Sequence, residues 1–260
     1  MRQTALDEFL EAISSVPATG QGACSDTVWK LTAEFFRGRG FDRLIYMDVR
    51  LGSSRMHTTL PKEWVRHYQD SGYDRIDPFF TYCCPTYTPI GTGIDYCDNY
   101  NYLSAVEKRL IGEASDFGFR AGFSSIIRRS GPTGFTGFNI GSSLSASEVD
   151  SLRAGMEAEL RLASVYAHDW LERSAQDRAM AALSSRERTC LSLLAEGQRT
   201  KDIAQSLGLS TAAIELYLRN ARRKLGASTR EQAVAIAWSQ GFATREWDSD
   251  PALPGGDRFG

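Results

Sequence analysis

A short stretch in the first third of the chain carries groups that could bind a small molecule: Trp64, Tyr68, Tyr73 and Asp77. Burying a carboxylate is costly unless it accepts hydrogen bonds, and an indole N–H or a phenol O–H can donate them. In an apolar cavity, this set would orient a small ligand that has both donors and acceptors. The residue types alone leave a second interpretation open, in which Trp64 and Tyr68 belong to the core and Asp77 caps a turn.

An enzymatic alternative would use Cys83 or Cys84 as a nucleophile and His57 or His67 as its base. The sequence has three histidines and contains no Gly-rich phosphate loop, nucleophile elbow or metal-spaced set of His and Cys residues. We therefore expect no catalytic site, no metal site and no cofactor.

A second group of residues, near the other end of the chain, has the pattern of a helix-turn-helix. Gly208 ends one predicted helix and Ser210 caps the next, which would enter the major groove of DNA. There Glu215 could accept from cytosine, Arg219 could donate to guanine and Leu216 could contact a thymine methyl group. The predicted DNA contacts are Thr200, Lys201, Ser210, Glu215, Leu216, Arg219, Arg222, Arg223 and Lys224. Charge alone leaves open a solvated basic face on an ordinary helical bundle.

Hydrophobic periodicity predicts the elements that position these two groups. In the N-terminal part it indicates helices at 7–13, 28–36, 63–71 and 104–117, strands at 43–49, 123–128 and 135–140, and a loop at 78–101. A long helix follows from Ser145 to Trp170, with an apolar stripe that includes Leu160, Val165 and Tyr166. The C-terminal part contains helices only, at 186–196, 200–207, 211–225 and 230–240. The predicted fold is an α/β sandwich (α-β-α) followed by an all-α four-helix helix-turn-helix domain.

These elements divide the chain into a ligand-binding domain at 1–173, a linker at 174–182, a DNA-binding domain at 183–243 and a mobile tail at 244–260. The net charge is -2, but residues 183–242 carry nine basic and five acidic side chains. The rest of the chain is therefore acidic, as expected for a sensor joined to a DNA reader. No apolar run approaches the roughly 18 residues of a membrane-spanning helix, so we expect a cytoplasmic protein without membrane contact.

The C-terminal part resembles the LuxR-type helix-turn-helix. The resemblance rests on Leu183-Ser-Ser-Arg-Glu, Leu191, Ala195-Glu-Gly197, Ile203-Ala204, Leu207-Gly-Leu-Ser210, Ile214, Asn220, Lys224-Leu225, Arg230, Ala233-Val234 and Gly241. In this family Glu187, Leu191 and Gly197 stand at near-invariant positions. The resemblance implies a DNA-binding transcription regulator.

The stretch Trp64, Tyr68 and Asp77-Pro78 resembles the acyl-homoserine-lactone-binding domain of LuxR-type quorum-sensing receptors, and so does the glycine-rich stretch from Phe117 to Gly122. The resemblance implies that the Trp indole donates to the lactone carbonyl, that the Asp accepts from the amide N–H, and that the Tyr lines the cavity. The expected ligand is an N-acyl-homoserine lactone or a related signal.

Two departures from the family pattern concern the ligand. Leu60 stands where a Tyr usually donates to the acyl carbonyl, and residues 89–93 lack the usual second Trp. One alternative is a regulator that responds to a different ligand; another is a ligand-independent regulator whose first domain only dimerises.

We expect a homodimer on a palindromic operator, with the helix from Ser145 to Trp170 as its interface, and RNA polymerase as a further candidate partner.

Overall fold

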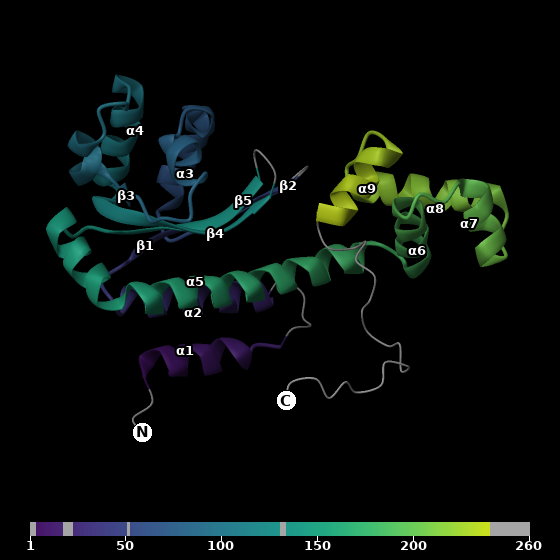
Figure 1. Cartoon of the computed structure of the whole chain (residues 1–260), viewed down its shortest axis with the longest axis horizontal. Coiled ribbons are helices and arrows are strands. Elements are labelled where there is room, and N and C mark those ends of the chain that lie inside the picture. Colours follow the sequence, from purple (N-terminus) through teal and green to yellow (C-terminus); the bar gives the residue numbers. More distant parts are fainter. Residues whose placement is uncertain (1–3, 18–22, 51–52, 131–133, 240–260) are drawn as a thin grey trace, which may run out of the picture. The chain divides into compact units, whose positions relative to one another are not determined.

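The computed structural model describes residues 4–17, 23–50, 53–130 and 134–239. The chain divides into two compact units, Met1–Arg178 and Ala179–Gly260 (Figure 1). The predicted tail at 244–260 lies outside the described residues. Within the described ranges, no helix is both long enough and apolar enough to cross a bilayer.

The first unit is built on a five-stranded antiparallel sheet with the order β2-β1-β5-β4-β3. The strands are β1 (Arg43–Arg50), β2 (Ser53–Thr58), β3 (Gly91–Thr92), β4 (Ala121–Ser130) and β5 (Gly134–Ser142). The three predicted strands are confirmed as β1, β4 and β5. The sequence did not indicate β2, whose residues are mostly polar, or β3, which has only two residues.

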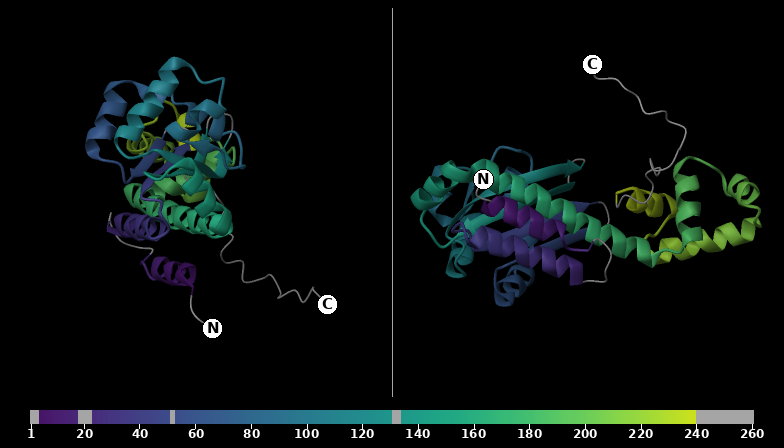
Figure 2. Two further views of the ribbon diagram at one scale, coloured as in Figure 1. Left: turned by 90° about the vertical axis from the view of Figure 1, so that its left-hand side faces the viewer. Right: turned by 90° about the horizontal axis from the view of Figure 1, so that it is seen from below.

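Helices cover both faces of this sheet, which confirms the α-β-α sandwich (Figures 1 and 2). Helices α3 (Lys62–Asp70) and α4 (Ala105–Asp116) lie on one face. Helices α2 (Ala23–Arg37) and α5 (Ala146–Ala182) lie on the other. Helix α1 (Ala5–Ser14) packs outside α2, where the rings of Phe9 and Phe35 lie 4.4 Å apart.

The two faces of β1 serve different packing layers because side chains alternate along a strand. Leu44 and Tyr46 are buried in the main core with residues of α2 and α5. Ile45 and Met47 point to the opposite face, where they pack with clusters that include residues of α3 and the segment after it. The predicted loop at 78–101 contributes to that face and contains two short helices, a π-helix at Phe79–Cys83 and a 3-10 helix at Ile94–Asn99.

Helix α5 is longer than predicted, and the predicted apolar stripe is only partly buried. It continues through residues 174–182, the predicted linker, and its backbone departs from helical geometry at Met156 (φ -143°, ψ 18°). Its buried residues include Leu160, Ala163, Ala167 and Leu171, spaced by three or four positions. Val165 and Tyr166, which we predicted in the same stripe, are each 39% exposed. The predicted stripe therefore divides between residues in the core, such as Leu160, and residues on the outer surface of the helix.

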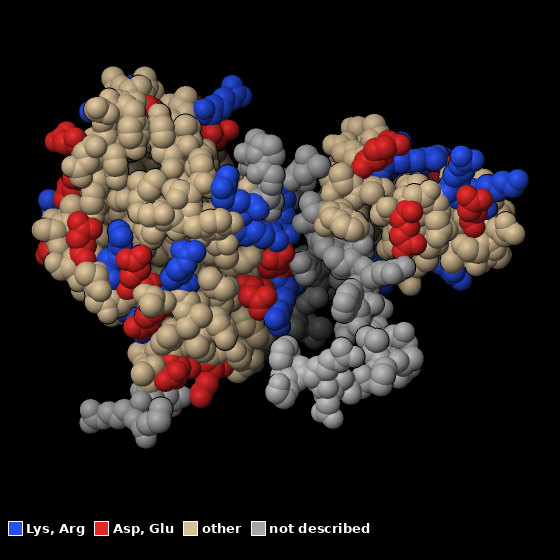
Figure 3. All heavy atoms as spheres, viewed as in Figure 1, with Lys and Arg blue, Asp and Glu red and all other residues tan. Residues whose placement is uncertain are grey.

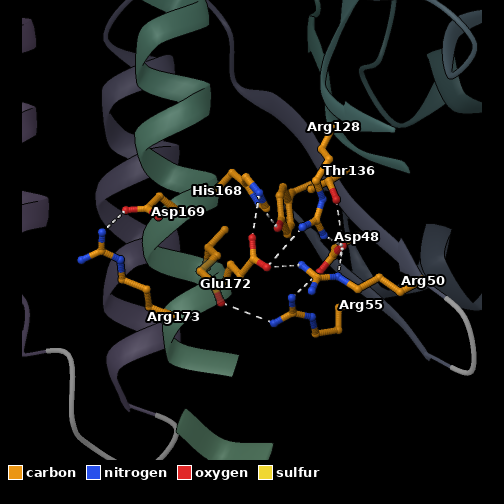
Figure 4. A network of polar contacts seen from close by, with 11 residues as sticks. Asp48, Arg50, Arg55, Arg128, Thr136, His168, Asp169, Glu172 and Arg173 are labelled. Carbon is orange, nitrogen blue, oxygen red and sulfur yellow. Dashed lines mark hydrogen bonds and ion pairs between the residues drawn. The ribbon is translucent and has the colours of Figure 1, made fainter. Parts of the chain in front are cut away.

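A buried network of ion pairs connects α5 to the sheet (Figure 4). The Asp48 carboxylate is fully buried, pairs with Arg50 at 2.9 Å and with Arg55, and accepts a hydrogen bond from the Thr136 hydroxyl at 2.8 Å. From α5, Glu172 pairs with Arg50 at 2.8 Å. Burial would raise the pKa of both carboxyl groups, but hydrogen bonds and charges from their partners outweigh it and lower the pKa of each.

The second unit consists, in its described residues, of the four predicted helices: α6 (Ser185–Ala195), α7 (Thr200–Leu207), α8 (Thr211–Lys224) and α9 (Arg230–Ser239). Ser184 and Glu187 form the predicted capping box at the start of α6. Gly208 ends α7 in the left-handed conformation (φ 62°), and the Ser210 hydroxyl accepts from the Ala213 N–H at the start of α8. These caps define the tight turn between the two helices, which confirms the helix-turn-helix.

Candidate ligand cavity and DNA-reading surface

A cavity lies between the sheet and the helices α3 and α4. Its wall is mostly apolar and aromatic, with a few polar groups, as is typical of small-molecule sites. The lining residues are Ile45, Leu60, Trp64, Tyr68, Asp77, Pro78, Phe79, Tyr82, Cys83, Ile90, Gly91, Thr92, Gly93, Cys97, Tyr100, Tyr102, Leu103, Leu110, Ile111, Ala114, Phe119 and Asn139. Three of the four residues that we predicted to bind ligand, Trp64, Tyr68 and Asp77, therefore meet at one cavity.

Asp77 is held in place from two sides. One carboxylate oxygen accepts from the Tyr68 hydroxyl at 2.8 Å, and the other accepts from the Phe79 N–H at 2.9 Å. Burial raises the pKa of Asp77, although these two hydrogen bonds oppose the shift. A carboxylate has about four acceptor positions. Asp77 can therefore accept a further hydrogen bond from a donor inside the cavity, and such a donor would offset part of the cost of burying it.

Trp64 and Tyr68 lie four positions apart on α3, so they share one face of that helix. Trp64 is 5% exposed and packs against Phe117 and Tyr68, with ring centroids 5.3 and 6.1 Å apart. Within the described part of the chain its indole N–H has no hydrogen-bond partner, which leaves that donor for a ligand. Asp77 and Trp64 thus line the same cavity.

Tyr73, the fourth predicted ligand-binding residue, does not line the cavity. It packs behind Tyr68, with ring centroids 5.9 Å apart, and its hydroxyl donates to Glu113 of α4 at 2.7 Å. Gly72 adopts a left-handed conformation (φ 64°) at the end of α3 and turns the chain before Tyr73. Tyr73 therefore connects α3 to α4 and supports the cavity wall from outside.

The structure also brings to the cavity residues outside the four predicted ligand-binding residues. Thr92, which lies 28 residues after Trp64, donates from its hydroxyl to the Asn139 side-chain oxygen at 2.7 Å. Tyr82, Tyr100 and Tyr102 form an aromatic group, in which the rings of Tyr82 and Tyr102 lie 4.2 Å apart. Leu60, which replaces the usual Tyr, also lines the wall.

The cysteine alternative lacks an activated thiol. Burial raises the pKa of Cys83 to about 12, and the pKa of Cys84 is raised as well. His67 pairs with Glu113 at 2.7 Å, and His57 packs against the ring of Trp29. Both thiols are expected to stay protonated and unreactive at neutral pH.

The predicted DNA contacts lie on α7, on α8 and, for Ser210, at the cap that precedes α8; basic side chains are frequent on this unit (Figure 3). Lys201, Leu216 and Arg219 are exposed, as direct contact with bases or phosphates requires. Two charged residues of the predicted set form ion pairs within the protein. Lys224 pairs with Glu187 of α6 at 2.7 Å, and Glu215 pairs with Arg230 of α9.

The two units together define a class of protein: a small-molecule sensor joined to a helix-turn-helix DNA reader. Residues 25–171 match the family model described as autoinducer binding domain, and residues 181–237 match the one described as bacterial regulatory proteins, luxR family. The chain belongs to the luxR family of transcription regulators, which are not enzymes.

Individual relatives agree with this assignment over most of the chain. The transcriptional activator BjaR1 of Bradyrhizobium diazoefficiens is 28% identical over 242 residues, which cover 90% of this chain and 96% of BjaR1. Escherichia coli SdiA has the same fold, with a TM-score of 0.65 at 18% identity, covering 92% of this chain and 98% of SdiA. CepR2 of Burkholderia cenocepacia, an N-acylhomoserine lactone dependent factor, has a TM-score of 0.51 at 22% identity and covers 66% of this chain and 96% of CepR2.

Proposed function

We propose that the cavity of the first unit binds an N-acyl-homoserine lactone and that the chain is a quorum-sensing regulator. The observation that carries this proposal is that Trp64, whose indole can donate, and Asp77, whose carboxylate can accept, line the same mostly apolar and aromatic cavity. A lactone carbonyl matches the Trp64 N–H, and an amide N–H matches the Asp77 carboxylate. Tyr68 orients Asp77 through its hydroxyl and lines the cavity.

Ligand binding would control DNA binding by stabilising the folded state of the first unit. A ligand that binds only the folded state stabilises that state by mass action. The lactone would bridge the sheet and α3 by filling the space between them, and would thereby favour the form of the first unit that supports DNA binding. The relatives are named as transcriptional activators, so RNA polymerase is the candidate partner at the promoter, and the cytoplasm is the compartment where such a regulator meets DNA.

We further propose that the chain binds a palindromic operator as a homodimer. A two-fold operator presents two half-sites, which a two-fold dimer matches. Leu162, Val165 and Tyr166 form an exposed apolar strip on the outer face of α5 and are the candidate interface. Sedimentation of the lactone-bound chain should show a dimer; a species that stays monomeric at all concentrations would contradict this part.

The ligand proposal is tested by thermal unfolding of the full chain with a panel of acyl-homoserine lactones of different chain length and substitution. At least one lactone should raise the unfolding temperature, since binding stabilises the folded state. Well-folded protein that shows no shift with any lactone would instead favour a different ligand or a ligand-independent regulator.

The Thr92 and Asn139 pair predicts a preference among lactones. The Asn139 side-chain oxygen is occupied by Thr92, so its amide N–H groups remain to donate to an oxygen on the acyl chain. Asn139→Leu should therefore lower the preference for 3-oxo or 3-hydroxy lactones over unsubstituted ones by about tenfold, the effect of one hydrogen bond. Calorimetric titration with lactones of equal chain length measures this ratio, and an unchanged ratio would rule out such a role for Asn139.

A further inference from the structure

A shallow hollow on the second unit has the composition of an anion site. It lies between α8 and α9 and is lined by Glu215, Leu218, Arg219, Arg222 and Arg230. Leu218 is buried, and the charged groups are three guanidinium groups and one carboxylate. The hollow is therefore positively charged overall, and arginine forks match the geometry of a phosphate group.

Arg230 joins three helices at this hollow. Its guanidinium group, from the first residue of α9, pairs with the Glu215 carboxylate of α8. It also lies 3.5 Å from the hydroxyl of Thr200, the first residue of α7. Thr200 and Glu215 both belong to the surface that we predicted to face DNA, and Arg230 lies between them. Arg230 was not among the predicted DNA contacts because it follows the helix-turn-helix in the sequence.

The pairing of Glu215 bears on how the DNA surface works. Arg230 pairs with one oxygen of the Glu215 carboxylate, and this contact fixes the direction in which each of the two side chains points. Both side chains are about two-fifths exposed, and ion pairs as exposed as this one contribute little to stability. The role of the pair is therefore to orient Arg230. It holds the Arg230 guanidinium group beside Arg219 and Arg222.

We propose that this hollow holds one backbone phosphate of duplex DNA, with Arg230 as a phosphate-binding residue and Glu215 as the residue that positions it. Glu215 then acts through Arg230 and reads no base. This inference rests on DNA binding by the second unit. It assigns Arg230 a contact with a DNA phosphate, and it replaces the predicted contact of Glu215 with cytosine.

The test measures DNA affinity of the full chain for a 30-base-pair duplex of random sequence, by fluorescence anisotropy between 50 and 200 mM KCl. Each phosphate contact contributes about 0.9 to the slope of log affinity against log salt. Arg230→Gln should reduce that slope by about one for each bound chain, and Arg230→Lys, which keeps the charge, should retain it. Arg109→Gln makes the same charge change on α4 of the first unit and should leave the slope unchanged.

The Glu215→Gln variant distinguishes two roles of Glu215, positioning Arg230 and contacting a base. Selection from a randomised duplex library should give the same sequence preference for this variant as for the wild type, while affinity falls by a similar factor on all sequences. A changed preference at one base pair would overturn the positioning role, and an unchanged salt slope in Arg230→Gln would overturn the phosphate contact. Wild-type protein that binds no duplex at all would contradict DNA binding itself, which is a different result from either of these.

Discussion

Asp77→Asn is expected to weaken lactone binding by about 10- to 100-fold, the cost of a hydrogen bond to a charged group. The variant should fold normally without ligand, because burial already disfavours the charged carboxylate and Asn retains an acceptor for the Phe79 N–H. Trp64→Phe removes the indole donor while keeping an aromatic ring, and should weaken binding by about tenfold. Thermal unfolding of each variant with and without lactone measures both quantities.

Tyr73→Phe is the matched control for these two changes. Tyr73 belongs to the same aromatic cluster, but its hydroxyl bonds to Glu113 outside the cavity. Its removal should lower the stability of the empty protein by about 1 kcal/mol and leave lactone affinity unchanged. If Tyr73→Phe weakened binding as much as Asp77→Asn, the cavity would not be organised as described.

Asp48→Asn should destabilise the first unit by about 3–5 kcal/mol, the typical cost of removing one partner from a buried ion pair. The side chain of Asp48 is fully buried, and its loss of charge would leave Arg50 and Arg55 without their shared carboxylate. Urea unfolding at neutral pH measures the difference. Asp169→Asn is the matched control, because the Asp169 and Arg173 pair on α5 is more than half exposed and points away from the network (Figure 4). It should cost less than about 1 kcal/mol.

The effect of Asp48→Asn should depend on pH. The pKa of Asp48 is lowered in the folded protein, so its contribution is complete above the unfolded pKa of about 3.9 and is lost as pH falls through the folded value. The difference between wild type and variant should therefore shrink on acidification, because the wild-type carboxyl group becomes neutral too. A difference that stays constant with pH would show that packing, rather than charge, accounts for the loss.

Sequence patterns predicted the elements that carry a strong local signal. Helix α8 has a capping Ser210 after a left-handed Gly208, and β1 has the alternation of a half-buried strand. Strand β2 has no such alternation and forms because it pairs with β1. Local patterns alone therefore could not indicate it.

The cavity residues were predictable only where they lie close together in the sequence. Trp64 and Tyr68 lie one helical turn apart, Asp77 follows in the same short stretch, and the resemblance to the acyl-homoserine-lactone receptors supported all three through their spacing. Thr92 and Asn139 lie 47 positions apart and meet because β3, β4 and β5 are neighbours in the sheet. No local pattern reports such a pairing, and for the same reason the contact of Glu215 with Arg230 could not be foreseen.

Native mass spectrometry tests the central claim most directly. The full chain, expressed in the presence of a mixture of acyl-homoserine lactones and then purified, should carry one lactone per chain. The Asp77→Asn variant, treated in the same way, should carry much less. A wild-type chain that is folded but holds no lactone, or a variant that holds as much as the wild type, would contradict the assignment of this cavity.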